Sequence, residues 1–311
     1  MRRLVVLAWI VAATAAGAQA AALGSSALSI IPAEVQQIIS VDYRTLKSSP
    51  TAMALKDRVL PENLKQFETA VKAFGLDPEK DIEQLAFVSF RAKDGTMQVI
   101  GVAQGQFPVE QIKKRMALRK VKPPTYRFQT LYPASGGLQM TFLDPSTMLF
   151  GYLSAVKIAL DTQAGEMSSL NSNNQIDDMM QDIEKSTVWS VLDSAGTQNM
   201  MRSALGDAAK LSDYDTVRKR LLGSRYAMEF SSGVNFNLDV FTSDNFTAAG
   251  LSSLVQAGMM YRKMSATGVE KVALESLKVD NDSSKLRLNF KTDDKKFESL
   301  LHSDLFAAVS K

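Results

Sequence analysis

The chain contains no cysteine and a single histidine among its 311 residues. The absence of cysteine excludes disulfide bonds, thiolate catalysis, thiolate metal sites and a lipid anchor on cysteine. One histidine, His302, excludes a histidine-rich metal centre. The sequence also lacks a glycine-rich phosphate loop and a dinucleotide-binding fingerprint. We therefore expect no metal site, no cofactor and no catalytic residue that these patterns would reveal.

Long hydrophobic runs are scarce as well. The longest, Leu4 to Ala16, falls short of the ~20 residues that a helix needs to span a bilayer. Arg2 and Arg3 precede it and Ala18-Gln19-Ala20 follows it, which is the pattern of a secretory signal peptide. We expect cleavage after Ala20, export to the periplasm or the exterior of a bacterial cell, and no transmembrane anchor in the mature chain.

The mature chain is nearly neutral. Removing residues 1–20, with two arginines and no acid, lowers the formal net charge from +3 to +1. Such a balance gives no global field toward nucleic acid, so we expect no nucleic-acid partner. The remaining chain is far above the ~100 residues at which a core can be stable without disulfide bonds.

Hydrophobic periodicity predicts an α+β fold in which one order of elements occurs twice. Each unit follows the order β-α-α-β-β-α-β-β-α, and its antiparallel sheet is expected to be covered on one face by helices. The expected divisions are a signal peptide (1–20), a first unit (28–165), a linker with an amphipathic helix (166–185) and a second unit (186–311). The linker is short, so the units should pack against each other.

Alternation with a period of two predicts the strands, and turn residues separate them. Lys93-Asp94-Gly95 and Ser231-Ser232-Gly233 each divide two alternating runs, which predicts two hairpins. Another alternating run, residues 126–132, predicts a single strand. Ser243 or Asp244 can cap a long helix that extends to about Met264.

Several segments in the first unit share one pattern: Ile31-Pro32-Ala33-Glu34, Val41 to Leu46, Ser49-Pro50 and Phe74 to Ile82. Over roughly residues 30–165 this pattern resembles a family of exported bacterial envelope proteins to which no activity is assigned. The resemblance implies an envelope location and supplies no functional residues. The same residues also have a local explanation, because Pro50 begins a helix and Gly75 can end one.

Candidates for chemistry have simpler structural explanations. His302 lies on the flank of a final helix with no serine and carboxylate facing it. Residues 154–157, 243–245 and 291–292 contain short patterns known from serine acyl-transfer enzymes, but Asp293 stands where the third pattern requires glycine. The acids of segments 177–184 and 280–282 suit a solvated helix face and a hairpin turn, respectively.

One run of basic residues could bind an anionic partner. It contains no acid, and Tyr126 and Phe128 lie at its end. Its members are Lys113, Lys114, Arg115, Arg119, Lys120, Lys122 and Arg127. A solvated helix face explains half of the same residues, so both interpretations stay open.

We consider three functions. The first is a non-catalytic envelope protein that acts as a binding or scaffolding module, with an anionic envelope component or another envelope protein as partner. The second is a carboxylate-based hydrolase of envelope polymer, which requires two acids that converge in a cleft and a perturbed pKa. The third is a carrier of an apolar ligand, with a cavity lined by residues such as Phe236, Leu238, Leu254 and Met259.

Overall fold

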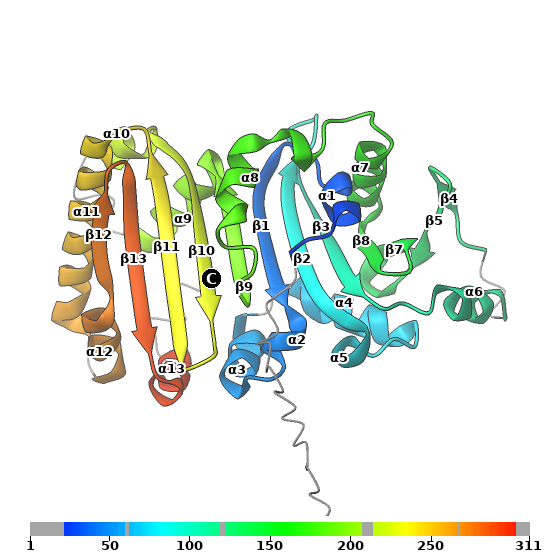
Figure 1. The fold of residues 1–311 in the computed structure, drawn as a ribbon, viewed down its shortest axis with the longest axis horizontal. Helices are drawn as coiled ribbons and strands as arrows, with labels where there is room; N and C mark the ends of the chain where they lie inside the picture. Colours follow the sequence, from blue (N-terminus) through cyan, green and yellow to red (C-terminus); the bar gives the residue numbers. More distant parts are fainter. Residues whose placement is uncertain (1–21, 60–61, 119–121, 207–213, 267, 303–311) are drawn as a thin grey trace, which may run out of the picture.

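One large antiparallel sheet organises the protein (Figure 1). The computed structural model describes residues 22–59, 62–118, 122–206, 214–266 and 268–302. Eleven of its strands lie in the order β12-β13-β11-β10-β9-β1-β2-β3-β8-β7-β6, and β4 pairs with β5 alone. The predicted α+β class with antiparallel strands is confirmed. The expected signal peptide, residues 1–20, lies outside the described residues.

The strands of the first half are β1 (Val35–Asp42), β2 (Ile82–Arg91), β3 (Met97–Gly105), β4 (Thr125–Tyr126), β5 (Gln129–Thr130), β6 (Tyr132–Pro133), β7 (Leu138–Asp144) and β8 (Thr147–Tyr152). Those of the second half are β9 (Val188–Asp193), β10 (Leu221–Glu229), β11 (Val234–Thr242), β12 (Lys278–Asp282) and β13 (Lys285–Thr292). Both predicted hairpins are confirmed, as β2–β3 and β10–β11.

The two halves meet at the pair β1–β9. From this pair the strands run outward as β1-β2-β3-β8-β7 on one side and β9-β10-β11-β13-β12 on the other. The prediction of a separate sheet in each unit is therefore wrong, because the strands of both halves belong to one sheet. Ile38 of β1 lies opposite Val88 of β2 and also opposite Val191 of β9, so neither half ends in a free edge at the junction. Pairing two buried first strands satisfies backbone groups that would otherwise form exposed edges.

Helices cover both faces of the first half of the sheet. On one face α1 (Ser25–Ile30), α7 (Leu153–Gln163) and α8 (Asn174–Gln181) enclose a core that includes Ile38, Trp189 and Val191. On the other face α4 (Glu62–Ala73) packs Phe67 against Phe150 of β8 with ring centroids 3.9 Å apart. The expectation of helices on one face is therefore wrong for this half, because β2 and β3 carry apolar residues on both faces.

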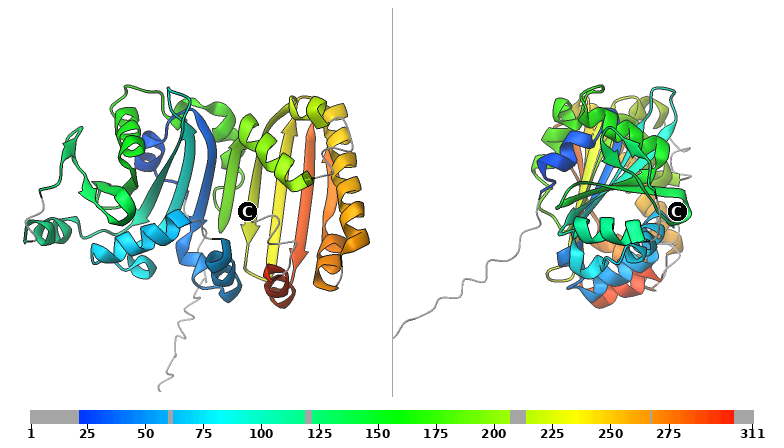
Figure 2. Two further views of the ribbon diagram at one scale, coloured as in Figure 1. Left: turned by 180° about the vertical axis from the view of Figure 1, so that it is seen from behind. Right: turned by 90° about the vertical axis from the view of Figure 1, so that its right-hand side faces the viewer.

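The second half is covered mainly on one face, as predicted. Seen from behind in Figure 2, α9 (Ser194–Leu205) lies across its strands, and α11 (Asn245–Ser265) flanks β12. On the opposite face, the row of paired residues that contains Ile38 and Val191 continues across β10, β11 and β13, where its members are charged. Arg225, Asp239 and Arg287 face one another there, with N···O distances of 3.1 Å and 3.4 Å.

Aspartate caps begin three helices in this half. Asp193 accepts a hydrogen bond from the backbone N–H of Gly196, Asp244 from that of Thr247, and Asp293 from that of Lys296. The predicted start of the long helix is thus confirmed at Asp244. The remaining helices are α2 (Tyr43–Leu46), α3 (Pro50–Val59), α5 (Pro78–Asp81), α6 (Val109–Leu118), α10 (Tyr214–Arg218), α12 (Gly268–Ser276) and α13 (Asp294–Leu301).

Within the described part of the chain, no helix combines the length and the hydrophobicity that a transmembrane span requires.

Candidate binding site

The predicted basic run is divided between α6 and the β4–β5 hairpin, which both lie at the end of the molecule beyond β7, with α6 below the hairpin in Figure 1. Lys113, Lys114 and Arg115 belong to α6, and Lys122 precedes the hairpin. Arg127 lies in the hairpin turn. Arg119 and Lys120 lie outside the described residues.

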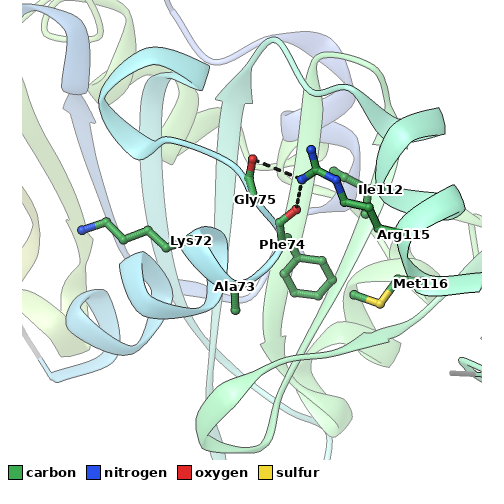
Figure 3. A pocket seen from close by; sticks show the side chains of 7 residues that line it. All are labelled: Lys72, Ala73, Phe74, Gly75, Ile112, Arg115 and Met116. Carbon is green, nitrogen blue, oxygen red and sulfur yellow. Dashed lines mark hydrogen bonds between the residues drawn. The ribbon is translucent and has the colours of Figure 1, made fainter. Parts of the chain in front are cut away.

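Two cations of α6 have structural partners. Lys113 forms an ion pair with Glu110 at 2.8 Å, and this hydrogen bond lowers the pKa of Glu110. The Arg115 guanidinium donates hydrogen bonds to the backbone carbonyls of Phe74, at 3.1 Å, and Gly75, at 3.5 Å (Figure 3). It therefore caps the C-terminal end of α4, where a cation is favourable. Lys114, in contrast, is exposed and has no ion pair among the described residues.

A larger residue at Gly75 would displace the Arg115 guanidinium from the end of α4. Gly75 has φ +77°, and a Cβ atom added there would lie 1.8 Å from Nη1 of Arg115. Arg115 also lines a pocket of about 280 Å³ with Lys72 and Met116, but its guanidinium is already held by the two carbonyls. Gly75 thus ends the helix as predicted, and Arg115 is a structural residue.

The β4–β5 hairpin turns at Arg127 and Phe128, both at positive φ, +48° and +63°. Tyr126 pairs with Gln129, so these two residues form the whole turn. Two consecutive residues at positive φ are typical of a type I′ turn, in which glycine, asparagine and aspartate are favoured. The sequence contains none of these here, and our prediction of one continuous strand over 126–132 is wrong for that reason.

An ion-pair network fixes the turn to α7. Arg127 Nε donates to Asp161 at 2.8 Å, and its Nη2 pairs with Glu166. The Tyr126 hydroxyl donates to both oxygens of Asp161, at 2.9 Å and 3.0 Å, which raises the pKa of Tyr126. Lys157 Nζ lies 5.1 Å from the centre of the Tyr126 ring. The carboxylates neutralise Arg127, which makes it a support of the turn.

Phe128 follows Arg127 in the turn that this network holds in place. Its side chain is fully exposed, with a relative accessibility of 105%, and no described residue covers it. Leu118 at the end of α6 is 83% exposed. A bulky aromatic residue at positive φ is a conformational outlier, and such outliers cluster at functional sites.

The residues considered for catalysis do not converge. Ser154 and Lys157 lie on α7 in the first half, whereas Lys291 lies on β13 in the second. His302 is an exposed residue at the end of α13. No group of three or more potential metal ligands occurs among the described residues.

The hydrolase hypothesis requires a perturbed acid, and one carboxyl among the described residues, that of Asp193, has a raised pKa. Burial raises the pKa of Asp193, whose carboxylate also accepts the backbone N–H of Gly196 at 2.6 Å. This hydrogen bond makes Asp193 a helix cap. The Glu34 carboxylate also raises the pKa of Asp193, whereas the Arg91 guanidinium lowers it, so this acid has charged neighbours of both signs.

The residues proposed to line an apolar cavity are packed. Leu238, Leu254 and Met259 lie against the core formed by Leu251, Val240 and their neighbours. The Phe236 ring lies 5.7 Å from the ring of Tyr226. This packing favours a structural role for all four.

No protein-family model matches the chain, and no curated protein matches it. Among solved structures, crystal form I of TP0453 from Treponema pallidum aligns with a TM-score of 0.49 and 7% identity, covering 91% of this chain and 96% of that one. Crystal form IV aligns with a TM-score of 0.45 and 8% identity, covering 89% and 96%. At these values a shared function does not follow, so the interpretation depends on the site's own geometry.

Proposed function

We propose that this protein is an exported, non-catalytic binding module of the bacterial envelope that docks on an anionic lipid surface through Phe128 and the basic residues Lys114 and Lys122. The observation that carries the proposal is the fully exposed ring of Phe128 at positive φ, supported by the Arg127 ion pairs with Asp161 and Glu166. The proposal includes cleavage of residues 1–20, the two tandem units and an envelope location.

Two exposed basic residues that precede the ring in the sequence support an anionic partner. Segment 113–127 contains no acid, and its cations Lys114 and Lys122 are exposed and have no ion pair among the described residues. A cation near an anionic membrane contributes about 1 kcal/mol, and burial of a Phe side chain contributes about 1.5–3 kcal/mol. The two contributions together give weak, reversible docking that salt should diminish.

The test is pelleting of the mature protein with vesicles of phosphatidylglycerol, compared with phosphatidylcholine. We expect binding to the anionic vesicles, a decrease of about tenfold or more for Phe128→Ser, and a similar decrease for Lys114→Gln combined with Lys122→Gln. Leu222→Ser is the control, because Leu222 is an exposed apolar residue of β10 in the other half of the sheet and should leave binding unchanged. Equal binding to both vesicle types, or none to either, would overturn the proposal.

A further inference from the structure

Helix α11 exposes a face that carries no charge. The helix spans Asn245–Ser265, and its first charged residue is Arg262. The inner face, with Ala248, Leu251 and Val255, is buried against the sheet. A surface helix normally places charged residues on its outer face. Here the outer face requires another explanation.

The outer face combines large apolar residues with small ones. Phe246, Met260 and Met264 have relative accessibilities of 88%, 70% and 87%, and Tyr261 is also exposed. Ala249, Ser253 and Ala257 are exposed between them. At 3.6 residues per turn all of these except Tyr261 lie on one narrow stripe of the helix. Phe246 and Met260 are therefore separated along the stripe by small residues, which leave the middle of the stripe recessed relative to its two ends.

The stripe is symmetric about Ser253. Ala249 and Ala257 lie four residues before and after it, and Phe246 and Met260 lie seven residues before and after it. Reversing the direction of the helix therefore exchanges a small residue for a small one and a large apolar residue for a large apolar one. A two-fold interface requires this self-complementarity, because residue i of one copy contacts residue j of the other and the reverse.

We propose that the α11 stripe binds the same stripe of a second copy of this chain, antiparallel and with Ser253 at the two-fold axis. In this arrangement Phe246 packs against Met260 of the other copy, and the small residues at the centre allow the helices to approach closely. The charges at the two ends of α11 also favour this antiparallel arrangement. Asp244 stands at one end of the helix, and Arg262 and Lys263 stand in its last turn, so antiparallel helices oppose ends of opposite charge.

The position of α11 leaves the stripe accessible. The helix lies at the outer end of the molecule beside the edge strand β12 (Figure 1). Lys278, Asp280 and Asp282 place charges on that strand, which disfavours edge-to-edge pairing as the mode of association. Val269 and Val272 of the neighbouring helix α12 are exposed apolar residues as well.

Length limits the strength of the contact. A helix of this size is about 30 Å long, and its stripe is smaller than the ~800 Å² per partner of a standard interface. We therefore expect a weak dimer that depends on concentration. A membrane is the less suitable occupant, because helices that lie on membranes carry Lys and Arg along their polar face and α11 has none before its last turn.

Sedimentation velocity of the mature protein from about 1 µM to 1 mM tests the proposal. We expect a monomer–dimer equilibrium that Ser253→Glu weakens by at least about tenfold, since two like charges would then meet at the axis. Ser299→Glu is the matched control, because both serines are exposed on helices and donate to the carbonyl four residues earlier, at 3.0 Å and 2.9 Å. A monomer throughout this range, or equal weakening by both variants, would overturn the proposal.

Cross-linking tests the geometry separately. The chain has no cysteine, so a single introduced thiol reports one position. Under a mild oxidant that accepts two electrons and two protons per disulfide, Ser253→Cys should dimerise quickly. Ala249→Cys and Ala257→Cys should react with each other when mixed, and faster than either does alone. If Ser253→Cys reacts no faster than Ser299→Cys, the two-fold arrangement is contradicted. If Ser253→Glu loses vesicle binding while the dimer stays intact, the stripe binds lipid and the proposal is overturned.

Discussion

Arg127 Nε lies 2.8 Å from Oδ1 of Asp161, and this ion pair joins the β4–β5 hairpin to helix α7. The same carboxylate accepts the Tyr126 hydroxyl. One acid therefore holds both residues that precede Phe128. The network fixes a turn whose backbone conformation is unfavourable for its own residues.

Replacing Asp161 should loosen the hairpin and leave the sheet intact. In Asp161→Ala, Arg127 and Tyr126 lose their shared partner, so backbone amides of residues 125–130 should exchange hydrogen faster. Thermal unfolding should change little, because the pair lies at the surface. Hydrogen exchange measured by mass spectrometry checks this, and unchanged exchange in the hairpin would show that the network does not support the turn.

Phe128→Gly should separate stability from binding. Glycine adopts positive φ without the penalty of ~1–2 kcal/mol that other residues incur, so the turn should be stabilised by up to about 1 kcal/mol after the entropy of glycine in the unfolded chain is subtracted. Vesicle binding should be lost at the same time. Urea unfolding and vesicle pelleting measure the two effects, and a less stable variant would contradict the strain assigned to this turn.

The lowered pKa of Asp244 implies that the protein loses stability in acid. Hydrogen bonds from Ser243 and then from Thr247 lower the pKa of Asp244 to about 2, below the ordinary value of about 3.9. A lowered pKa in the folded state contributes stability above pH ~4 that disappears as the pH falls toward 2. Asp244→Asn keeps the cap acceptor and lacks the charge, so its free energy of unfolding should fall less than that of the wild type over this window. Urea unfolding at several pH values measures the difference, and parallel curves would contradict it.

Ile38→Ala should destabilise both halves together. Ile38 is fully buried where β1 joins β2 and β9, and truncation of such a side chain costs about 2–5 kcal/mol. Trp189 in the neighbouring strand is the only tryptophan after residue 20, so its fluorescence reports the junction. Fluorescence and circular dichroism should give one coincident transition in the wild type and in the variant. Two separated transitions would show that the halves fold independently.

Local signals predicted much of this fold. Period-two alternation and glycine turns located β2–β3 and β10–β11, and an aspartate before an apolar periodic segment located the start of α11 at Asp244. These features depend on residues close together in the sequence. The short helices α1, α2 and α12 were not predicted, because their few turns carry too little periodicity.

Other features depend on residues far apart. The pairing of Ile38 with Val191 makes one sheet from two halves, and nothing near either strand indicates it. At the candidate site, the sequence suggested the basic run and its neighbouring aromatic residues. It could not show that Arg115 caps α4, that Arg127 pairs with Asp161, or that a turn without glycine or asparagine occurs at Phe128.

Fluorescence of a Phe128→Trp variant measures whether the tip of the hairpin enters the lipid. Trp189 is fully buried and should emit unchanged, so the added indole reports the tip of the hairpin. On addition of phosphatidylglycerol vesicles we expect its emission to shift to shorter wavelength and to be quenched by lipids with brominated acyl chains. Emission that stays at the wavelength of an exposed indole and is not quenched by these lipids would contradict docking through this residue.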